Sequence, residues 1–237
     1  ICDSKIIYGN VSKQKKMKTL GPTHNILGKK IKYHSRTDNF LIKIKKINSF
    51  NRLTSIRTIK QKKVLYFGTE FTGFRYGPNR DVHPILYSRW QRKLLDWLKV
   101  ETGISPIVRL HPKRQTKIFD PLGYKDCKNF SIDNFADCDF FCIDYPTTSF
   151  AYVSATKKPV IFFDLGLRKL NRSAMKIIKK RCHYSKVDWN NFDASFKQIK
   201  KTFNNKVSDE FTDTFTYDGN SLNEANKVAN FILNSSK

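Results

Sequence analysis

The sequence lacks any hydrophobic run that approaches the roughly 18 residues required by a membrane-spanning helix. We therefore expect no membrane-spanning helix. The chain begins at Ile1 rather than at methionine, and no basic and then apolar segment of the signal-peptide type opens it. We therefore expect a fragment or a processed chain, in which a missing N-terminal half would supply part of the functional site.

Paired cysteine motifs are also absent. The five cysteines are irregularly spaced and form no CxxC pair, so they indicate neither a zinc site nor a disulfide framework. We identify no acidic cluster that would hold a divalent cation for catalysis, and we expect neither a metal nor a cofactor. The cysteines, which we expect to be reduced, are Cys2, Cys127, Cys138, Cys142 and Cys182.

Acidic residues are scarce: 20 Asp and Glu stand against 45 Lys and Arg, which gives a formal net charge of +25. The excess is concentrated in residues 1–63 and 168–206. Basic patches attract phosphate-bearing partners, namely nucleic acid, an anionic membrane surface or nucleotide-linked substrates. The abundance of Lys, Asn, Ile and Phe is equally typical of a genome of biased composition, so both explanations of the charge stay open.

Short apolar runs that end abruptly in turn-forming residues dominate the second part of the chain. Residues 107–112 (IVRLHP) and 140–149 (FFCIDYPTTS) are two of them, and similar runs lie at 63–68 and 158–164. Such runs are typical of strands buried on both faces of a parallel sheet. Amphipathic segments of helical spacing alternate with them, for example residues 87–100.

This alternation predicts an α/β fold, a Rossmann-like parallel sheet flanked by helices, over residues 63–237. Residues 1–62 are expected to be a basic segment, the end of a missing N-terminal domain with an interdomain linker. In open α/β sheets, ligands bind outside the carboxyl ends of the strands. The residues that follow the strands are therefore the candidate site.

Two segments at that edge carry the strongest candidates. Pro112 biases His111 towards an extended conformation, so Arg109 and His111 share one face of a strand and suit an anionic phosphate. His111 also qualifies as a general acid or base. Hydroxyl side chains at the start of a predicted helix at 148–155 form an anion site with its free N–H groups, although they also serve as helix caps. These hydroxyl side chains are those of Thr147, Thr148 and Ser149, and they follow Asp144, which is also a candidate.

Weaker candidates surround these two segments. A loop after the strand at 63–68 offers phosphate donors without matching GxGxxG or a P-loop, and its glycines also fit a simple turn. Asp164 ends another strand, where it either binds a ribose hydroxyl or an acceptor, or caps a turn. His24 is expected where an N-terminal domain meets this one. The loop residues are Gly68, Thr69 and Thr72.

Four motifs together resemble a known group of enzymes. A strand ending in HP at His111, DYPTTS at 144–149, KKPVIFFD at 157–164 and YDG at 217–219 are similar to the C-terminal half of GT-B glycosyltransferases. The resemblance covers about 63–235 and is strongest to bacterial surface-polysaccharide enzymes. These are the CDP-glycerol glycerophosphotransferases, the capsule Kdo transferases and related surface carbohydrate biosynthesis proteins.

The resemblance implies a metal-independent glycosyltransferase or glycerophosphotransferase. Its donor, a nucleotide-activated sugar or CDP-glycerol, would lie against this domain, and its acceptor would be a glycan or polymer. Arg109 and His111 would neutralise the leaving phosphate, and the hydroxyl cluster at 147–149 would bind it at the helix N-terminus. The catalytic base would lie on the N-terminal domain. The enzyme would act in the cytoplasm, peripherally at the inner face of the membrane, in capsule or cell-envelope biosynthesis.

The sequence departs from these families at two points. Phe150, Ala151 and Tyr152 stand where the teichoic acid enzymes have an acidic residue, and the ExxxxxxxE pattern of many retaining enzymes is absent. Donor, acceptor, stereochemistry and oligomeric state therefore stay undefined. Two alternatives remain: a basic nucleic-acid-binding module and an enzyme like the sugar-nucleotide 2-epimerases. The first would need exposed aromatic residues among its basic ones, and the second would need carboxylates and histidines around a sugar.

Overall fold

The sheet predicted from the sequence is present and is parallel throughout. The computed structural model describes residues 4–7, 32–35, 43–44, 56–68, 83–110, 124–127, 131–145, 148–167 and 172–211. In this part of the chain six strands form one sheet in the order β5-β4-β3-β6-β7-β8. Its strands are β3 (Val64–Phe67), β4 (Ile107–Arg109), β5 (Lys125–Asp126), β6 (Phe140–Ile143), β7 (Val160–Asp164) and β8 (His183–Lys186).

Every neighbouring pair in this sheet is parallel. Counted from β3 as the first strand, the order is 3-2-1-4-5-6, which is the order of the Rossmann sheet. The α/β, Rossmann-like fold class is thereby confirmed. The sequence also predicts a terminal helix at 222–233, and these residues lie outside the described part of the chain.

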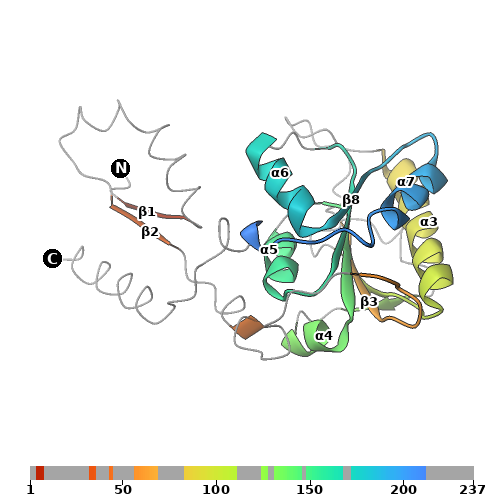
Figure 1. Cartoon of the computed structure of the whole chain (residues 1–237), viewed down its shortest axis with the longest axis horizontal. Coiled ribbons are helices and arrows are strands. Elements are labelled where there is room, and N and C mark those ends of the chain that lie inside the picture. The colour runs from red at the N-terminus through yellow and green to blue at the C-terminus, as the bar shows by residue number, and fades with distance from the viewer. Residues whose placement is uncertain are drawn as a thin grey trace.

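Helices cover both faces of the sheet and make a three-layer arrangement (Figure 1). Two of them, α3 and α7, lie on one side, and the other three lie on the opposite side. The helices are α3 (Pro84–Thr102), α4 (Ile132–Asp137), α5 (Thr148–Ala155), α6 (Arg172–Arg181) and α7 (Phe192–Lys200). None of the helices in the described ranges is long and apolar enough to cross a membrane.

The apolar strands divide the core into two clusters, one on each face of the sheet. All four residues of β3 and of β6 are buried, because both strands lie in the interior of the sheet and bury side chains on both faces. On the α3 and α7 side, the Trp90 ring lies 5.2 Å from that of Phe163 and 5.5 Å from that of Phe196. On the other side, Phe150 lies 4.6 Å from Phe211.

Local sequence sets the limits of the helices that flank the candidate site. Pro84 begins α3, where its missing N–H costs no hydrogen bond, and Gly103 ends it in the left-handed conformation at φ 72°. The backbone N–H of Gly103 donates to the carbonyl of Lys99. Ser131 caps α4 by accepting from the N–H of Asn134.

Residues that precede β3 also contribute to the core. Ile56 and Ile59 are 3% exposed and belong to the cluster on the α3 side, although they precede the expected domain boundary at residue 63. The N–H of Ile56 donates to His183 Nε2 at 3.4 Å, which ties this segment to β8. Ile44 lies in the cluster on the opposite face.

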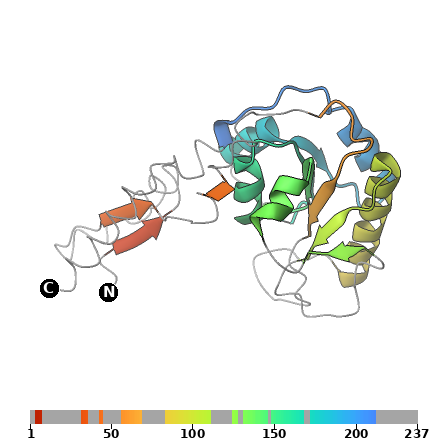
Figure 2. The same cartoon turned by 90° about the horizontal axis from the view of Figure 1, so that it is seen from below.

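A second, two-stranded sheet lies nearer the N-terminus. It pairs β1 (Ser4–Ile7) in parallel with β2 (Lys32–Ser35). No strand of this sheet pairs with the six-stranded sheet in the described residues. Figures 1 and 2, which view the chain from directions 90° apart, both show β1 and β2 apart from the larger sheet.

Candidate functional site at the switch point

The sheet reverses its direction of growth between β3 and β6. From β3 the chain adds β4 and β5 on one side and then crosses to add β6, β7 and β8 on the other. Phe67 of β3 is paired with Ile143 of β6, so the next residues, Gly68 and Asp144, leave neighbouring strands at the same edge. Such a reversal separates the loops that follow the two strands, and a crevice for ligands forms between them.

Asp144 lies at this switch point, fully buried, at the centre of a polar cluster. Its Oδ2 accepts a hydrogen bond from the Tyr87 hydroxyl at 2.7 Å and a second, short one from the Tyr66 hydroxyl. Tyr66 comes from β3 and Tyr87 from α3, so the carboxylate joins three elements of the fold. A buried carboxylate requires such donors, because it has lost its hydration shell.

Gln91 completes the cluster from the side of α3. Its Nε2 donates to the Tyr87 oxygen at 3.0 Å and to the Tyr66 oxygen at 3.2 Å. Because both tyrosines give their own hydrogens to Asp144, their oxygens can only accept from Gln91. The hydrogen bonds therefore all point towards the carboxylate, and each link polarises the next.

Both tyrosine side chains are buried, and burial has a chemical consequence for Tyr66. Desolvation, followed by the nearby charge of Asp144, raises the pKa of Tyr66 well above its ordinary value. The phenol therefore stays neutral near pH 7 and cannot serve as a general base. The cluster joins the ends of β3 and β6 to α3, and a base for chemistry must be a group other than Tyr66.

Gly68 lies against this cluster at the end of β3. A Cβ at this position would lie 2.7 Å from Gln91 Nε2, 3.3 Å from the Tyr87 hydroxyl and 3.4 Å from the Tyr66 hydroxyl. The absence of a side chain thus lets the backbone run directly over the polar cluster. The predicted role of Gly68 as part of a loop beside a ligand is compatible with this position.

Arg109 ends β4 on the other side of Gly68. Its carbonyl accepts from the Gly68 N–H at 3.1 Å, and its Nη1 donates to the carbonyl of Cys127 at 2.7 Å. The guanidinium is half-buried and holds the end of β5 next to β4. This places a positive charge at the carboxyl edge, as the phosphate-binding prediction requires, while one of its donors is already used by the fold.

Helix α5 begins four residues after Asp144, so its N-terminus lies at the same edge. The first turn of α5 contains no acidic residue, and Ser149 in that turn is half-buried. At the other end of α5, the Nη2 of Arg181 donates to the carbonyl of Ser154 at 2.9 Å. The cation at the C-terminus matches the helix dipole at that end, and the dipole at the N-terminus, whose first turn has no acidic residue, favours an anion there.

Asp164 ends β7 further along the edge, where it forms a turn. Its Oδ1 accepts from the N–H of Gly166 at 2.9 Å, and its Oδ2 accepts from the Tyr184 hydroxyl at 2.8 Å. Burial, followed by the hydrogen bond to Asp164, raises the pKa of Tyr184. Of the two expected roles, turn capping is the one that this geometry displays.

Several predicted residues lie outside the described part of the chain. For Thr148 the backbone is described, at the first position of α5, but the side chain is not. The predicted site residues that lie outside the described part are His24, Thr69, Thr72, His111 and Thr147. Of the described ones, Gly68, Arg109 and Asp144 are brought together at the ends of β3, β4 and β6.

Sequence reasoning missed Tyr66, Tyr87 and Gln91, which hold Asp144. The signal was weak but present: Tyr87 and Gln91 are four residues apart, so one face of the predicted helix carries two polar groups beside the apolar ones. Nothing in the sequence connects that face with Tyr66 or with Asp144.

Within the described ranges, no three His, Cys, Asp or Glu side chains gather as metal ligands. The expectation of a metal-independent site stays a prediction. Comparisons of the chain with protein-family models, with curated proteins and with solved structures gave no match.

Proposed function

We propose that this chain is the donor-binding part of a transferase that uses a nucleotide-activated sugar or CDP-glycerol. The observation that carries the proposal is the reversal between β3 and β6, with the N-terminus of α5 next to it. A Rossmann-type sheet binds nucleotides at this position, and a helix N-terminus there favours phosphate. The acceptor in this proposal is a glycan or polymer of the cell surface.

The chain's part in the reaction is to hold the donor and stabilise its leaving group. The acceptor hydroxyl forms a new bond to the transferred sugar carbon or glycerol phosphate, and the bond to the nucleotide phosphate breaks. The proton of the hydroxyl passes to a general base, which is proposed to lie outside this domain, and negative charge grows on the leaving phosphate. Arg109 offers a positive charge near it, and the N–H groups of α5 and the hydroxyl of Ser149 offer hydrogen-bond donors. His111 is proposed to donate to the same phosphate.

The setting of the reaction is likewise proposed. A cell-surface polymer built from cytoplasmic nucleotide donors would be extended at the inner face of the membrane. The basic surface of the chain favours attachment to that anionic face without a membrane-spanning helix.

Calorimetry tests the proposal most directly. CMP, CDP, UDP, GDP and a short oligonucleotide are titrated into the chain at two salt concentrations. We expect one nucleotide to bind selectively, and Ser149→Ala and Arg109→Gln to weaken it by about tenfold each, because each removes a donor to a charged phosphate. Thr58→Ala, which removes an exposed hydroxyl from the segment before β3, is the matched control and should change nothing.

Two outcomes would overturn the proposal. The first is the absence of selective nucleotide binding by the unsubstituted chain. The second is salt-sensitive binding of the oligonucleotide that Ser149→Ala and Arg109→Gln leave unchanged, which would favour a nucleic-acid-binding module.

A further inference from the structure

Two connections of the chain leave the sheet at the switch point, and the ends of both are attached to the Asp144 cluster. The first leaves β3 at Gly68 and leads to α3, which begins at Pro84. The second leaves β6 at Asp144 and leads in four residues to α5, which begins at Thr148. A ligand at a switch point lies between two such connections, so the positions of their ends set the shape of its site.

The first connection meets the cluster at both of its ends. At Gly68, an added Cβ would lie 2.7 Å from Gln91 Nε2 and 3.3 Å from the Tyr87 hydroxyl. At the other end, the N–H of Tyr87 in the first turn of α3 donates to the carbonyl of His83 at 3.0 Å. The hydroxyl of Tyr87 donates to Asp144 at 2.7 Å. This hydrogen bond therefore attaches the start of α3 to the residue from which the second connection departs.

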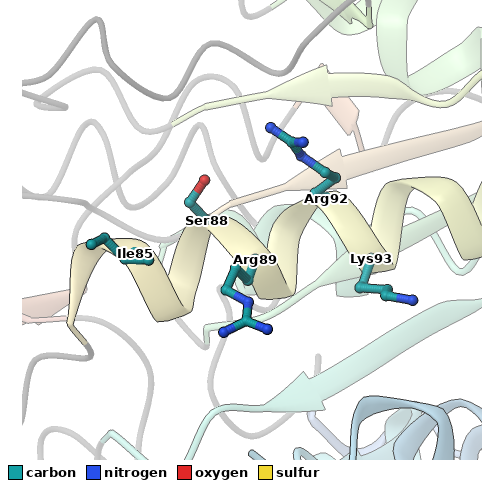
Figure 3. A pocket seen from close by; sticks show the side chains of 5 residues that line it. All are labelled: Ile85, Ser88, Arg89, Arg92 and Lys93. Atoms are coloured by element: carbon teal, nitrogen blue, oxygen red, sulfur yellow. The ribbon is translucent and has the colours of Figure 1, made fainter.

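The outer side of α3 takes no part in this attachment. Figure 3 shows its polar side chains pointing to two opposite flanks of the helix, Ser88 and Arg92 to one and Arg89 and Lys93 to the other. Tyr87 and Gln91 lie on the side that faces the sheet, where they reach the cluster. These two residues thus connect the first turns of α3 with the switch point.

The two tyrosines are buried too deeply to touch a ligand in the crevice. Tyr66 is fully buried and Tyr87 is 2% exposed. Their hydroxyl groups donate to Asp144 and accept from Gln91. An effect of Tyr87 on a bound ligand must therefore act through the elements that the tyrosine joins.

From these contacts we infer that Tyr87 is a positioning residue of the donor site. Its hydrogen bond to Asp144 fixes the start of α3 relative to the segment that leads to α5. The inference rests on the proposed function, because its ligand is the nucleotide of the proposed donor. Binding groups must be held within about 0.5 Å of their productive geometry, and a buried hydrogen bond between the two walls of the crevice supplies that precision. The affinity for the nucleotide therefore depends on a hydroxyl that the nucleotide does not touch.

A second tyrosine bonded to α3 offers a matched comparison. The Tyr124 hydroxyl donates to Asp96 of α3 at 2.9 Å. Asp96 lies nine residues after Tyr87, about two and a half turns further along the helix and away from the switch point. Both bonds join a phenol to a carboxylate and hold α3 to the sheet. Only the bond of Tyr87 lies between the two connections, so the pair separates positioning of the site from general stability.

The test is a double-mutant cycle on nucleotide affinity. Calorimetry gives the Kd for whichever of CMP, CDP, UDP and GDP binds the unsubstituted chain most tightly, at a temperature where every variant is folded. Tyr87→Phe and Asp144→Asn should each raise this Kd by about fivefold, because each removes or weakens the same bond. The double variant should raise it by about fivefold to tenfold, well below the product of the single effects. In the control cycle, Tyr124→Phe and Asp96→Asn should each change the Kd by less than about twofold.

Hydrogen exchange locates the effect within the fold. In Tyr87→Phe, the amides of α5 should exchange faster, because the segment before α5 is no longer held to α3, whereas the amides of α7 should keep their rates. In Tyr124→Phe, the rates in α5 should be unchanged. A merely structural role for Tyr87 would instead raise the exchange rates of both helices together.

Several results would overturn the inference while leaving the proposed function intact. They are selective nucleotide binding with an unchanged Kd in Tyr87→Phe, additive effects of Tyr87→Phe and Asp144→Asn, and equal losses of affinity in the two cycles. The absence of selective nucleotide binding by the unsubstituted chain would overturn the proposed function and this inference together. The affinity of the unsubstituted chain thus tests the proposed function, and the comparison of the two cycles tests the role of Tyr87.

Discussion

Asp144 and Asp164 end neighbouring strands at the same edge of the sheet, yet their surroundings differ. Asp144 is fully buried and joins β3, β6 and α3 through two tyrosine hydroxyls. Asp164 is half-buried, and its bonds reach only Gly166 two residues away and Tyr184 on the adjacent strand. A position directly after a strand therefore does not fix the role of a carboxylate. Its role depends on how deeply the carboxylate is buried and on which elements carry its hydrogen-bond donors.

Replacing Asp144 should have the largest effect. Asp144→Ala leaves two buried tyrosine hydroxyls without their acceptor, and we expect it to lower the free energy of unfolding by about 3 kcal/mol. Denaturant titration measures this loss. Asp144→Asn keeps one acceptor oxygen and the volume, so it should cost less than Asp144→Ala. An unchanged midpoint in Asp144→Ala would show that the cluster does not stabilise the fold.

Replacing Asp164 should have a smaller effect, because its neighbours can turn to water. We expect Asp164→Ala to cost about 1 kcal/mol in the same titration, for the loss of two partly exposed hydrogen bonds. Tyr184→Phe, which removes only the hydroxyl donor, is the matched control. If Asp164→Ala and Asp144→Ala were equally destabilising, the contrast between the two aspartates would fail.

The smallest loss of stability is expected at mildly acidic pH, and His183 of β8 should cause it. His183 is 1% exposed; its Nδ1 bonds the carbonyl of Thr202 at 2.8 Å, so Nε2 is the acceptor for the Ile56 N–H. Burial lowers the pKa of His183 in the folded chain. The unfolded chain therefore binds this proton first, and stability should be complete above about pH 6.5 and fall below it.

Denaturant titrations between neutral and mildly acidic pH measure this slope. His183→Gln should flatten this slope, because the glutamine side chain does not ionise. Asp144→Asn should leave the slope unchanged, because His183 lies in a different part of the sheet. A slope that His183→Gln does not alter would assign the acid sensitivity to another group.

The central strands and the helices beside them were predictable from local sequence. The apolar runs around residues 64–67, 140–143 and 160–164 place β3, β6 and β7. The amphipathic pattern at 87–100 places α3, although the helix begins earlier, at Pro84, and ends at Thr102. These elements can be recognised in the sequence because burial of one whole face, or of both faces, gives them a regular pattern of apolar residues.

Two edge elements escaped sequence reasoning for physical reasons. β5 is two residues long, and β8 has the sequence HYSK, in which a polar histidine fills a buried position. His183 fits there because a backbone N–H and a backbone carbonyl satisfy both ring nitrogens. Those partners lie 127 and 19 residues away, so no local pattern could reveal them.

The candidate site was predictable in its location but not in its contacts. The strand ends pointed to Gly68, Arg109, Asp144 and Asp164, and all four lie at the carboxyl edge. The bonds from Tyr66 and Tyr87 to Asp144 span 78 and 57 residues, so only the folded chain shows them.

The link between Ile56 and His183 has a consequence for how the chain folds during synthesis. Ile56 leaves the ribosome 127 residues before the histidine that receives its N–H. The segment that leads into β3 also bonds α3, through the N–H of Gln61 and the carbonyl of Thr102, but its link to β8 cannot form until the last strand of the sheet has been made. The incomplete domain therefore lacks this contact, and is exposed to chaperones or to other nascent chains, for most of its translation.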